Sequence, residues 1–189
     1  MNPNPLLAMV ALAASAAVQA QPKAAQLLPA QSEIVFTTKQ MGVPVEGRFG
    51  SFSAQITLDP KKPETGTVSF VIDTGSARFG SAELDGEVGK PTWLNVPRFP
   101  QASFKSSAVK ATGPGRFEVA GKLSLKGAVQ DLVLPVQLVR AGAISMASGS
   151  FTIKRLAFKV GEDEWSDTSL LADEVVVRFK LALSGLAAP

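Results

Sequence analysis

Apolar and polar residues alternate along most of the chain after position 32, in short runs divided by Gly, Pro and Asp. From 116 to 125, for example, Phe117 and Val119 alternate with Arg116 and Glu118. A period of two is typical of β-strands that turn one face to an apolar interior and the other to water. The pattern predicts about eight strands, over residues 34–36, 52–58, 68–72, 102–106, 117–125, 132–138, 151–153 and 175–183.

The segment from 81 to 94 departs from this period. Leu84 and Val88 lie four positions apart, and Ser81 can cap a helix. We expect a short helix here that ends at Pro91 or soon after it. Its narrow apolar face would suit either a lid over one end of the fold or a plain surface helix.

Eight antiparallel strands with one apolar face can form a sandwich or close into a barrel. Closure removes the unpaired edges that a secreted β-protein must otherwise protect, and the interior of such a barrel is either filled or holds one small ligand. Ala54, Gly121 and Ala157 are small residues on the expected inner face, which favours a cavity, although the same pattern would serve a packed core. We therefore predict an all-β fold with one short helix, built as an eight-stranded antiparallel β-barrel.

The first residues of the chain look unlike the rest. Positions 6–18 are almost entirely Leu, Met, Val and Ala, a run shorter than the ~20 residues of a membrane span. Val18 and Ala20 then stand where a signal peptidase reads its cleavage site, although no Lys or Arg precedes the apolar run. We expect residues 1–20 to be a cleaved signal peptide, 21–31 a linker and 32–185 the barrel domain, with no membrane span in the mature chain. The alternative for the first segment is an uncleaved anchor or a core helix.

Composition narrows the chemistry open to this chain. Its 189 residues include no Cys and no His. This removes Ser-His and Cys-His catalysis and argues against a zinc or copper centre, so we expect a protein without catalytic residues, metal or cofactor. The 19 basic and 16 acidic residues are interspersed without a basic stripe, which favours a solvated surface over nucleic-acid binding.

Four stretches of the sequence resemble the YceI-like family. They are FTTKQMGVPVEGRF at 36–49, WLNVPRFPQASFKS at 93–106, GKLSLKG at 121–127 and FTIKRLAFKVG at 151–161. The matches occur in the family's order and run from about residue 32 to 184, over nearly the whole expected mature chain. The chain departs from the family in having no His where some members carry one near the first strand pair.

The resemblance implies an extended, lipocalin-like β-barrel in the bacterial periplasm. Its elongated cavity would hold a long apolar molecule, typically a polyisoprenoid or a quinone-related chain. Members of the family are often dimeric, so a homodimer is one option for this chain. A missing His would leave no such side chain to contact a ligand head group.

The candidate ligand-binding residues are mainly apolar side chains expected on the inner face of the strands. For each of them the alternative is a packed core position. They are Phe36, Val45, Phe49, Phe52, Ile56, Phe70, Ile72, Phe104, Leu123, Leu125, Leu134, Val136, Phe151, Ile153, Arg155, Val177, Phe179 and Leu181.

Arg155 is the one charged residue among these candidates. It shares the odd-numbered face of its strand with Phe151 and Ile153, which places it inward. A buried guanidinium needs a carboxylate or several backbone carbonyls. We expect an internal structural pair in preference to contact with a ligand's polar end, and a β-bulge could instead turn the side chain outward.

Three hypotheses for function follow. The first is a periplasmic carrier or store for an apolar lipid. The second is an enzyme, such as a hydrolase, that acts on an apolar substrate through Arg155 and a nearby carboxylate with a raised pKa. The third is a filled barrel that serves as a structural or interaction module.

Overall fold

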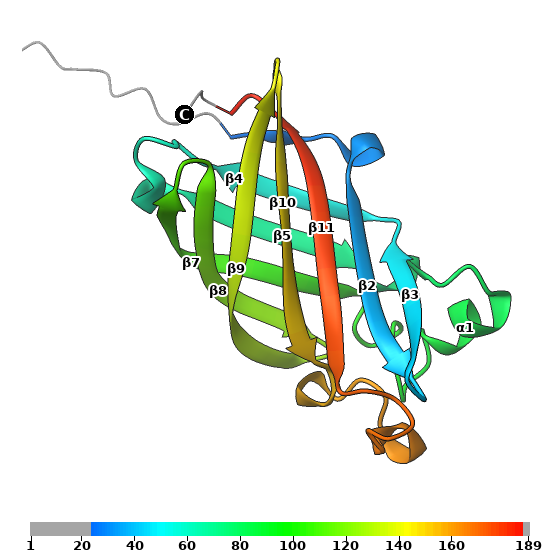
Figure 1. Cartoon of the computed structure of the whole chain (residues 1–189). Helices are drawn as coiled ribbons and strands as arrows, with labels where there is room; N and C mark the ends of the chain where they lie inside the picture. Colours follow the sequence, from blue (N-terminus) through cyan, green and yellow to red (C-terminus); the bar gives the residue numbers. More distant parts are fainter. Residues whose placement is uncertain (1–23, 187–189) are drawn as a thin grey trace, which may run out of the picture.

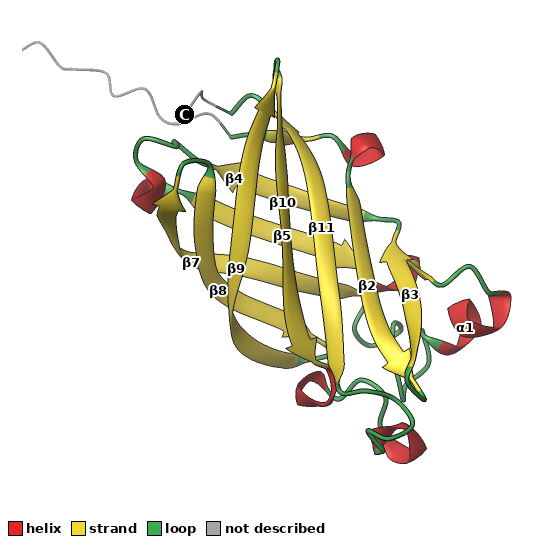
Figure 2. Ribbon diagram, viewed as in Figure 1, coloured by secondary structure: helices red, strands yellow, loops and turns green. Residues whose placement is uncertain are grey.

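The computed structural model describes residues 24–186, so the expected signal peptide and residues 21–23 of the expected linker lie outside the described residues. Strands make up most of the structure, and one α-helix and five short 3₁₀ segments connect them (Figures 1 and 2). The strands are β1 (Gln26–Leu27), β2 (Glu33–Gln40), β3 (Val43–Phe49), β4 (Phe52–Thr57), β5 (Thr67–Asp73), β6 (Ala77–Arg78), β7 (Gln101–Gly113), β8 (Arg116–Leu125), β9 (Ala128–Ala141), β10 (Ile144–Lys154) and β11 (Glu174–Ser184). The helices are α1 (Ala82–Glu87) and the 3₁₀ segments η1 (Pro29–Gln31), η2 (Pro63–Thr65), η3 (Thr74–Ser76), η4 (Arg155–Phe158) and η5 (Asp163–Ser166).

All strands belong to one antiparallel sheet. Its order is β4-β5-β7-β8-β9-β10-β11-β2-β3-β6, with β1 paired to β11. The sheet curls strongly, so that β4, β5, β7 and β8 cross behind β9, β10, β11 and β2 (Figure 1). The long strand β9 carries the chain from one layer to the other. This confirms the predicted all-β fold with one short helix.

The sheet has eleven strands where the sequence pattern predicts about eight. Two of the additional strands, β1 and β6, are only two residues long, which is too short to show an alternating pattern. The third, β3, contains Pro44 and Gly47, which break the alternation. Gly47 lies against the Phe36 ring, and a Cβ at Gly47 would come within 2.4 Å of the ring atom Cζ.

The curled sheet is closed only in part by hydrogen bonds. Strands β4 and β6 are the two ends of the strand order. At the upper end of the molecule in Figure 1, β1 pairs with β11, and the neighbouring Ala25 donates its N–H to the carbonyl of Ile56 in β4 at 2.7 Å. The short segment 25–27 thus links β11 to the edge strand β4, in place of the continuous ladder of a fully closed barrel.

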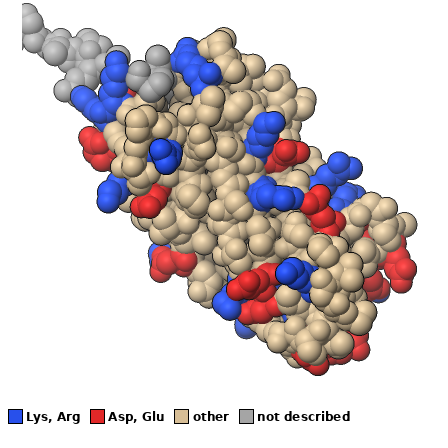
Figure 3. All heavy atoms as spheres, in the orientation of Figure 1, with Lys and Arg blue, Asp and Glu red and all other residues tan. Residues whose placement is uncertain are grey.

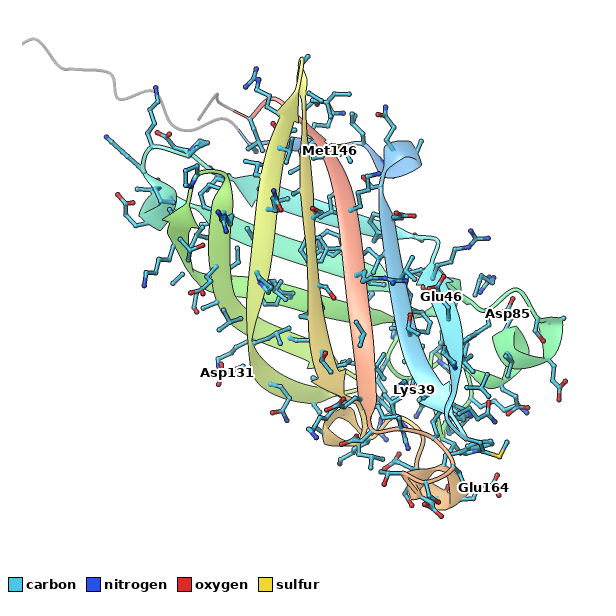
Figure 4. The ribbon with its side chains drawn as sticks, viewed as in Figure 1. Lys39, Glu46, Asp85, Asp131, Met146 and Glu164 are labelled. Atoms are coloured by element: carbon cyan, nitrogen blue, oxygen red, sulfur yellow. The ribbon has the colours of Figure 1, made fainter. Side chains whose placement is uncertain are left out.

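The predicted helix is shorter than the pattern indicates. α1 spans six residues and ends at Glu87. Ser81 stands at its N-cap without a side-chain capping bond, and Asp85 instead accepts a hydrogen bond from the backbone N–H of Phe79 at 2.6 Å. The helix lies beside β6 at the side of the molecule, where Asp85 is labelled, and does not cover an end of the sheet (Figure 4).

Candidate ligand-binding cavity

The concave face of the sheet encloses an apolar cavity of about 130 Å³. Two clusters of buried side chains meet around it, one centred on β11 and one on β7 and β8. Ser103 is the one polar residue among those in the wall. The wall consists of Ile34, Ile56, Leu58, Val68, Phe70, Ile72, Ala102, Ser103, Phe104, Val109, Phe117, Val119, Leu123, Leu132, Leu134, Val136, Leu138, Ala147, Phe151, Val177, Phe179, Leu181, Leu183 and Leu186.

Eleven of the candidate residues predicted from the sequence lie in this wall. They come from strands whose alternation is regular over several residues. They are Ile56, Phe70, Ile72, Phe104, Leu123, Leu134, Val136, Phe151, Val177, Phe179 and Leu181.

The seven other candidates lie outside the wall. Phe36 packs against Phe49 and Phe79, with ring centroids 5.0 and 5.3 Å apart, so these rings fill their own end of the sheet. Phe52 stacks on the wall residue Phe70, with ring centroids 5.8 Å apart. The remaining four are Val45 in β3, Leu125 at the end of β8, Ile153 in β10 and Arg155 in η4.

The sequence pattern missed the wall residue Val109 because a β-bulge after Ser106 changes the inward face of β7. The register of β7 against β8 shifts between Ser106 and Ala108. Phe104 therefore points inward from an even position and Val109 from an odd one. A longer alternating window, restarted after the bulge, would identify Val109. Leu186 lies after the last strand and carries no periodic signal.

Arg155 is the first residue of η4, a segment at the lower end of the molecule in Figure 1, and it does not line the cavity. Strand β10 ends at Lys154, and the chain turns into η4, so the strand register no longer applies at position 155. The side chain is only 2 % exposed, and its five N–H groups donate to five backbone carbonyls. Those carbonyls belong to Val160, Gly161, Trp165, Leu171 and Ala172, with distances that include 2.8 Å to Gly161 and 2.7 Å to Leu171.

The electrostatics of Arg155 follow from this burial. Burial lowers the pKa of the guanidinium from its ordinary value, and the negative charge of Asp173 partly opposes that shift. Gly161 allows the close fit, since a Cβ there would come within 2.6 Å of Arg155 Nη1. Arg155 thus holds together the segment 155–173, which we call the lower plug; Glu164 marks it in Figure 4.

Lys126 joins the lower plug to the rest of the sheet. It lies in the tight turn between β8 and β9, where Lys126 and Gly127 both have positive φ. Its Nζ donates to Glu162 Oε2 at 2.9 Å and to the carbonyl of Thr92 at 3.2 Å, and also to the carbonyl of Lys159. The lower end of the molecule is therefore fixed by directional polar bonds and the cavity by apolar packing.

The arrangement required for the enzyme hypothesis is not found among residues 24–186. The cavity wall contains no Asp or Glu, and Arg155 is satisfied by carbonyls outside it. Over the same residues, no cluster of three or more acidic side chains is placed to hold a metal ion. No helix in this range is long and apolar enough to cross a membrane. On the face shown in Figure 3, basic and acidic side chains are interspersed.

Solved structures show the same fold. The crystal structure of Burkholderia cenocepacia BcnA matches with a TM-score of 0.81 and 39 % identity, over 83 % of this chain and 99 % of that one. A polyisoprenoid binding domain from Saccharophagus degradans, implicated in plant cell wall breakdown, matches with a TM-score of 0.67 and 17 % identity, over 88 % of this chain and 99 % of that one. At that identity the second match shows the fold alone.

A similar relative among curated sequences is a UPF0312 protein of Yersinia pestis. It is 36 % identical over 110 residues, which are 58 % of this chain and 57 % of that protein. The match thus spans little more than half of the relative's length. The family model for the YceI-like domain matches residues 26–183, from the first residue of β1 to the last but one of β11. The chain belongs to the YceI-like domain family.

Proposed function

We propose that this protein binds a long apolar lipid, such as a polyisoprenoid or a quinone-like chain, and serves as a carrier or store for it. The observation that carries the proposal is the cavity wall, in which apolar side chains from both layers of the sheet surround one continuous space. Each CH₂ group moved from water into such a space contributes about 0.8 kcal/mol. A chain of many such groups binds tightly without polar contacts.

The size of the cavity bears on how the ligand is held. Its volume of about 130 Å³ is below the ~300–1,000 Å³ of pockets for drug-sized ligands. A long chain therefore has to move wall side chains apart as it enters. Rings such as Phe104 and Phe179 can rotate, whereas the strand ladders around them stay fixed.

A solved relative also supports a lipid ligand. The Saccharophagus degradans relative is a polyisoprenoid binding domain, and it has this fold.

We also propose a periplasmic location, based on the apolar segment at 6–18 and the cleavage pattern at Val18 and Ala20. N-terminal sequencing of the protein recovered from periplasmic extract should then begin at Gln21.

Mass spectrometry of the lipid released on denaturation tests the proposal directly. We expect an isoprenoid or similar chain to co-purify with the full-length protein. Denatured protein that releases no lipid, combined with no binding when prenyl alcohols are added back, would contradict it.

A pair of variants in β10 connects binding to the cavity. Ala147 is 6 % exposed and lies in the wall, whereas Ser150 on the same strand is exposed on the outer face. Ala147→Phe should weaken binding of a fluorescent prenyl alcohol by about tenfold or more, while Ser150→Phe should leave it unchanged. Ala147→Leu, a smaller change, provides an intermediate case if the Phe variant folds poorly.

A further inference from the structure

Strands β9 and β10 are hydrogen-bonded neighbours along only part of their length. Their register runs from Ala141 opposite Ile144 to Gln137 opposite Ser148 and ends there. Beyond that point β9 pairs with β8 down to Ala128, and β10 pairs with β11 down to Lys154. The lower halves of the two strands therefore border an open seam, where β9 curves away from β10 (Figure 1).

Pro135 explains why the ladder ends at this point. Backbone groups along a strand point alternately to its two neighbours. The N–H of Leu138 donates to the carbonyl of Gly115, on the β8 side, so the nitrogens at odd positions of β9 face β10. Proline has no N–H to donate, and position 135 is the next rung after Gln137. The two strands still lie close together at Pro135, because a Cβ at Gly149 of β10 would come within 2.1 Å of the Pro135 carbonyl oxygen.

A side pocket of about 220 Å³ lies at the open seam. Polar side chains of β9 and β10 line it, and Ala157 and Phe158 of η4 border it below. Its apolar floor includes Leu123 and Leu132, and both of these side chains also line the main cavity. The polar residues of the side pocket are Gln130, Asp131, Thr152 and Lys154. Asp131 points outward from β9 beside the seam (Figure 4).

Structured segments lie at both ends of the curled sheet. At the upper end Leu28 donates to the carbonyl of Ala182 at 2.8 Å, Ala182 donates to Ser32 Oγ at 2.9 Å, and Leu186 is buried against the cavity. At the lower end Arg155 and Lys126 tie the lower plug in place through eight hydrogen bonds, five from Arg155 and three from Lys126. Passage through either end would break several of these bonds, whereas the seam has no ladder to break.

We propose that the open seam between β9 and β10 is the portal through which an apolar ligand reaches the cavity. Leu123 and Leu132 form the partition between side pocket and cavity, and their rotation opens the passage. The polar rim keeps the outer mouth of the side pocket hydrated. This inference rests on the proposed function, since it concerns the same cavity and ligand class.

Blocking the portal should change rates and leave the equilibrium in place. Gln130 lines the side pocket but not the cavity, and it is exposed, so Gln130→Trp fills the mouth without replacing a residue of the cavity wall. Gln137→Trp is the matched control, because Gln137 is exposed on the same strand at the last paired rung. The ligand is all-trans-retinol, a fluorescent isoprenoid alcohol, mixed with the full-length protein by stopped flow.

We expect Gln130→Trp to slow both uptake and release by about tenfold, with an unchanged dissociation constant, and Gln137→Trp to change neither. Thr152→Trp, on the opposite rim, should act like Gln130→Trp and replaces it if that variant misfolds. Rates that match those of the unaltered protein in both rim variants would overturn the portal and leave the proposed function intact. Failure of the unaltered protein to bind retinol or any extracted prenyl lipid would contradict the proposed function itself.

Amide hydrogen exchange tests the open seam without any substitution. By the alternation that faces Pro135 toward β10, the N–H groups of Met146, Ser148, Ser150 and Thr152 face β9. We expect the amides of Ser150 and Thr152 to exchange at least about tenfold faster than those of Met146 and Ser148. Only Met146 and Ser148 lie in the ladder between β9 and β10. Equal protection of all four amides would show a closed seam and refute the portal.

Discussion

The lower plug and the cavity wall solve the problem of burial in opposite ways. In the plug, a single buried cation satisfies five carbonyls, and each bond has a fixed direction and length. In the wall, apolar side chains from many strands face a space that they do not fill. The plug therefore has one arrangement that works, whereas the wall has several of similar energy. This difference places rigidity at the end of the molecule and adaptability where a ligand would lie.

The largest expected effect is loss of the buried cation. Arg155→Ala would leave five carbonyls without their donor in a buried site, and should lower the free energy of unfolding by about 3–5 kcal/mol. Urea denaturation followed by circular dichroism measures this loss. Arg155→Lys keeps the charge but supplies three donors in place of five. Its free energy of unfolding should therefore lie between those of the unaltered protein and Arg155→Ala.

Arg178 provides the control for Arg155. It is an exposed arginine in β11 that pairs with Glu46 at 2.6 Å, and both side chains are more than half exposed. Arg178→Ala should cost no more than about 1 kcal/mol. Equal costs at positions 155 and 178 would mean that the carbonyls of the plug find water when the cation is removed.

A smaller effect is expected in the cavity wall. Leu134 lines the cavity from β9, so part of its surface already faces empty space. Leu134→Ala should cost about 2 kcal/mol, at the low end for a buried leucine, because fewer contacts are lost. Val133→Ala, one position along and 53 % exposed, should cost less than about 0.5 kcal/mol.

The same wall variant also tests adaptability. Leu134→Ala enlarges the cavity and should admit retinol at least as well as the unaltered protein does. A cost of about 4 kcal/mol or more, together with lost binding, would show that the wall is as rigid as the plug.

The regular strands could be predicted from the sequence because their alternation reports directly which side chains point inward. Phe117 and Phe179 show how well this works in β8 and β11, where no bulge or proline interrupts the pattern within the apolar run. The prediction at Arg155 extended a strand register one residue too far, into a turn whose position depends on Gly161 and the positive φ of Lys159. Sequence alternation carries no information about such a turn.

The open seam was invisible to the pattern for a different reason. Val133 and Val139 are both outward-facing residues of β9, and the alternation treats them alike. They differ in whether their backbone groups pair with β10: Val139 lies in the ladder, and Val133 lies beyond its end. Where the ladder ends depends on the direction in which Pro135 faces. That direction follows from the pairing of β8 with β9 and so requires the three-dimensional structure. Ala157 was expected on the inner face and instead lies in η4, beside the same seam.

The smallest expected effect concerns the pH dependence of the plug. The hydroxyl and the backbone N–H of Ser169 both donate to Asp167 Oδ1, at 2.7 and 2.8 Å, and the two bonds lower the pKa of this carboxyl below its ordinary value of 3.8. Because the folded-state pKa lies below the unfolded one, the ionised carboxylate stabilises the fold above the unfolded value. That contribution is lost as the pH falls through the folded-state pKa.

Ser169→Ala removes the hydroxyl donor, so the pKa of Asp167, followed by carboxyl carbon NMR, should rise toward 3.8. The variant should therefore be slightly less stable than the unaltered protein at neutral pH, and the gap should close in acid. Ser166→Ala is the control, since Ser166 bonds the carbonyl of Asp163 and should leave the titration of Asp167 unchanged. An unmoved titration in Ser169→Ala would mean that the backbone N–H alone holds the carboxylate, and the plug would then owe its order to Arg155 and Lys126 without help from this loop.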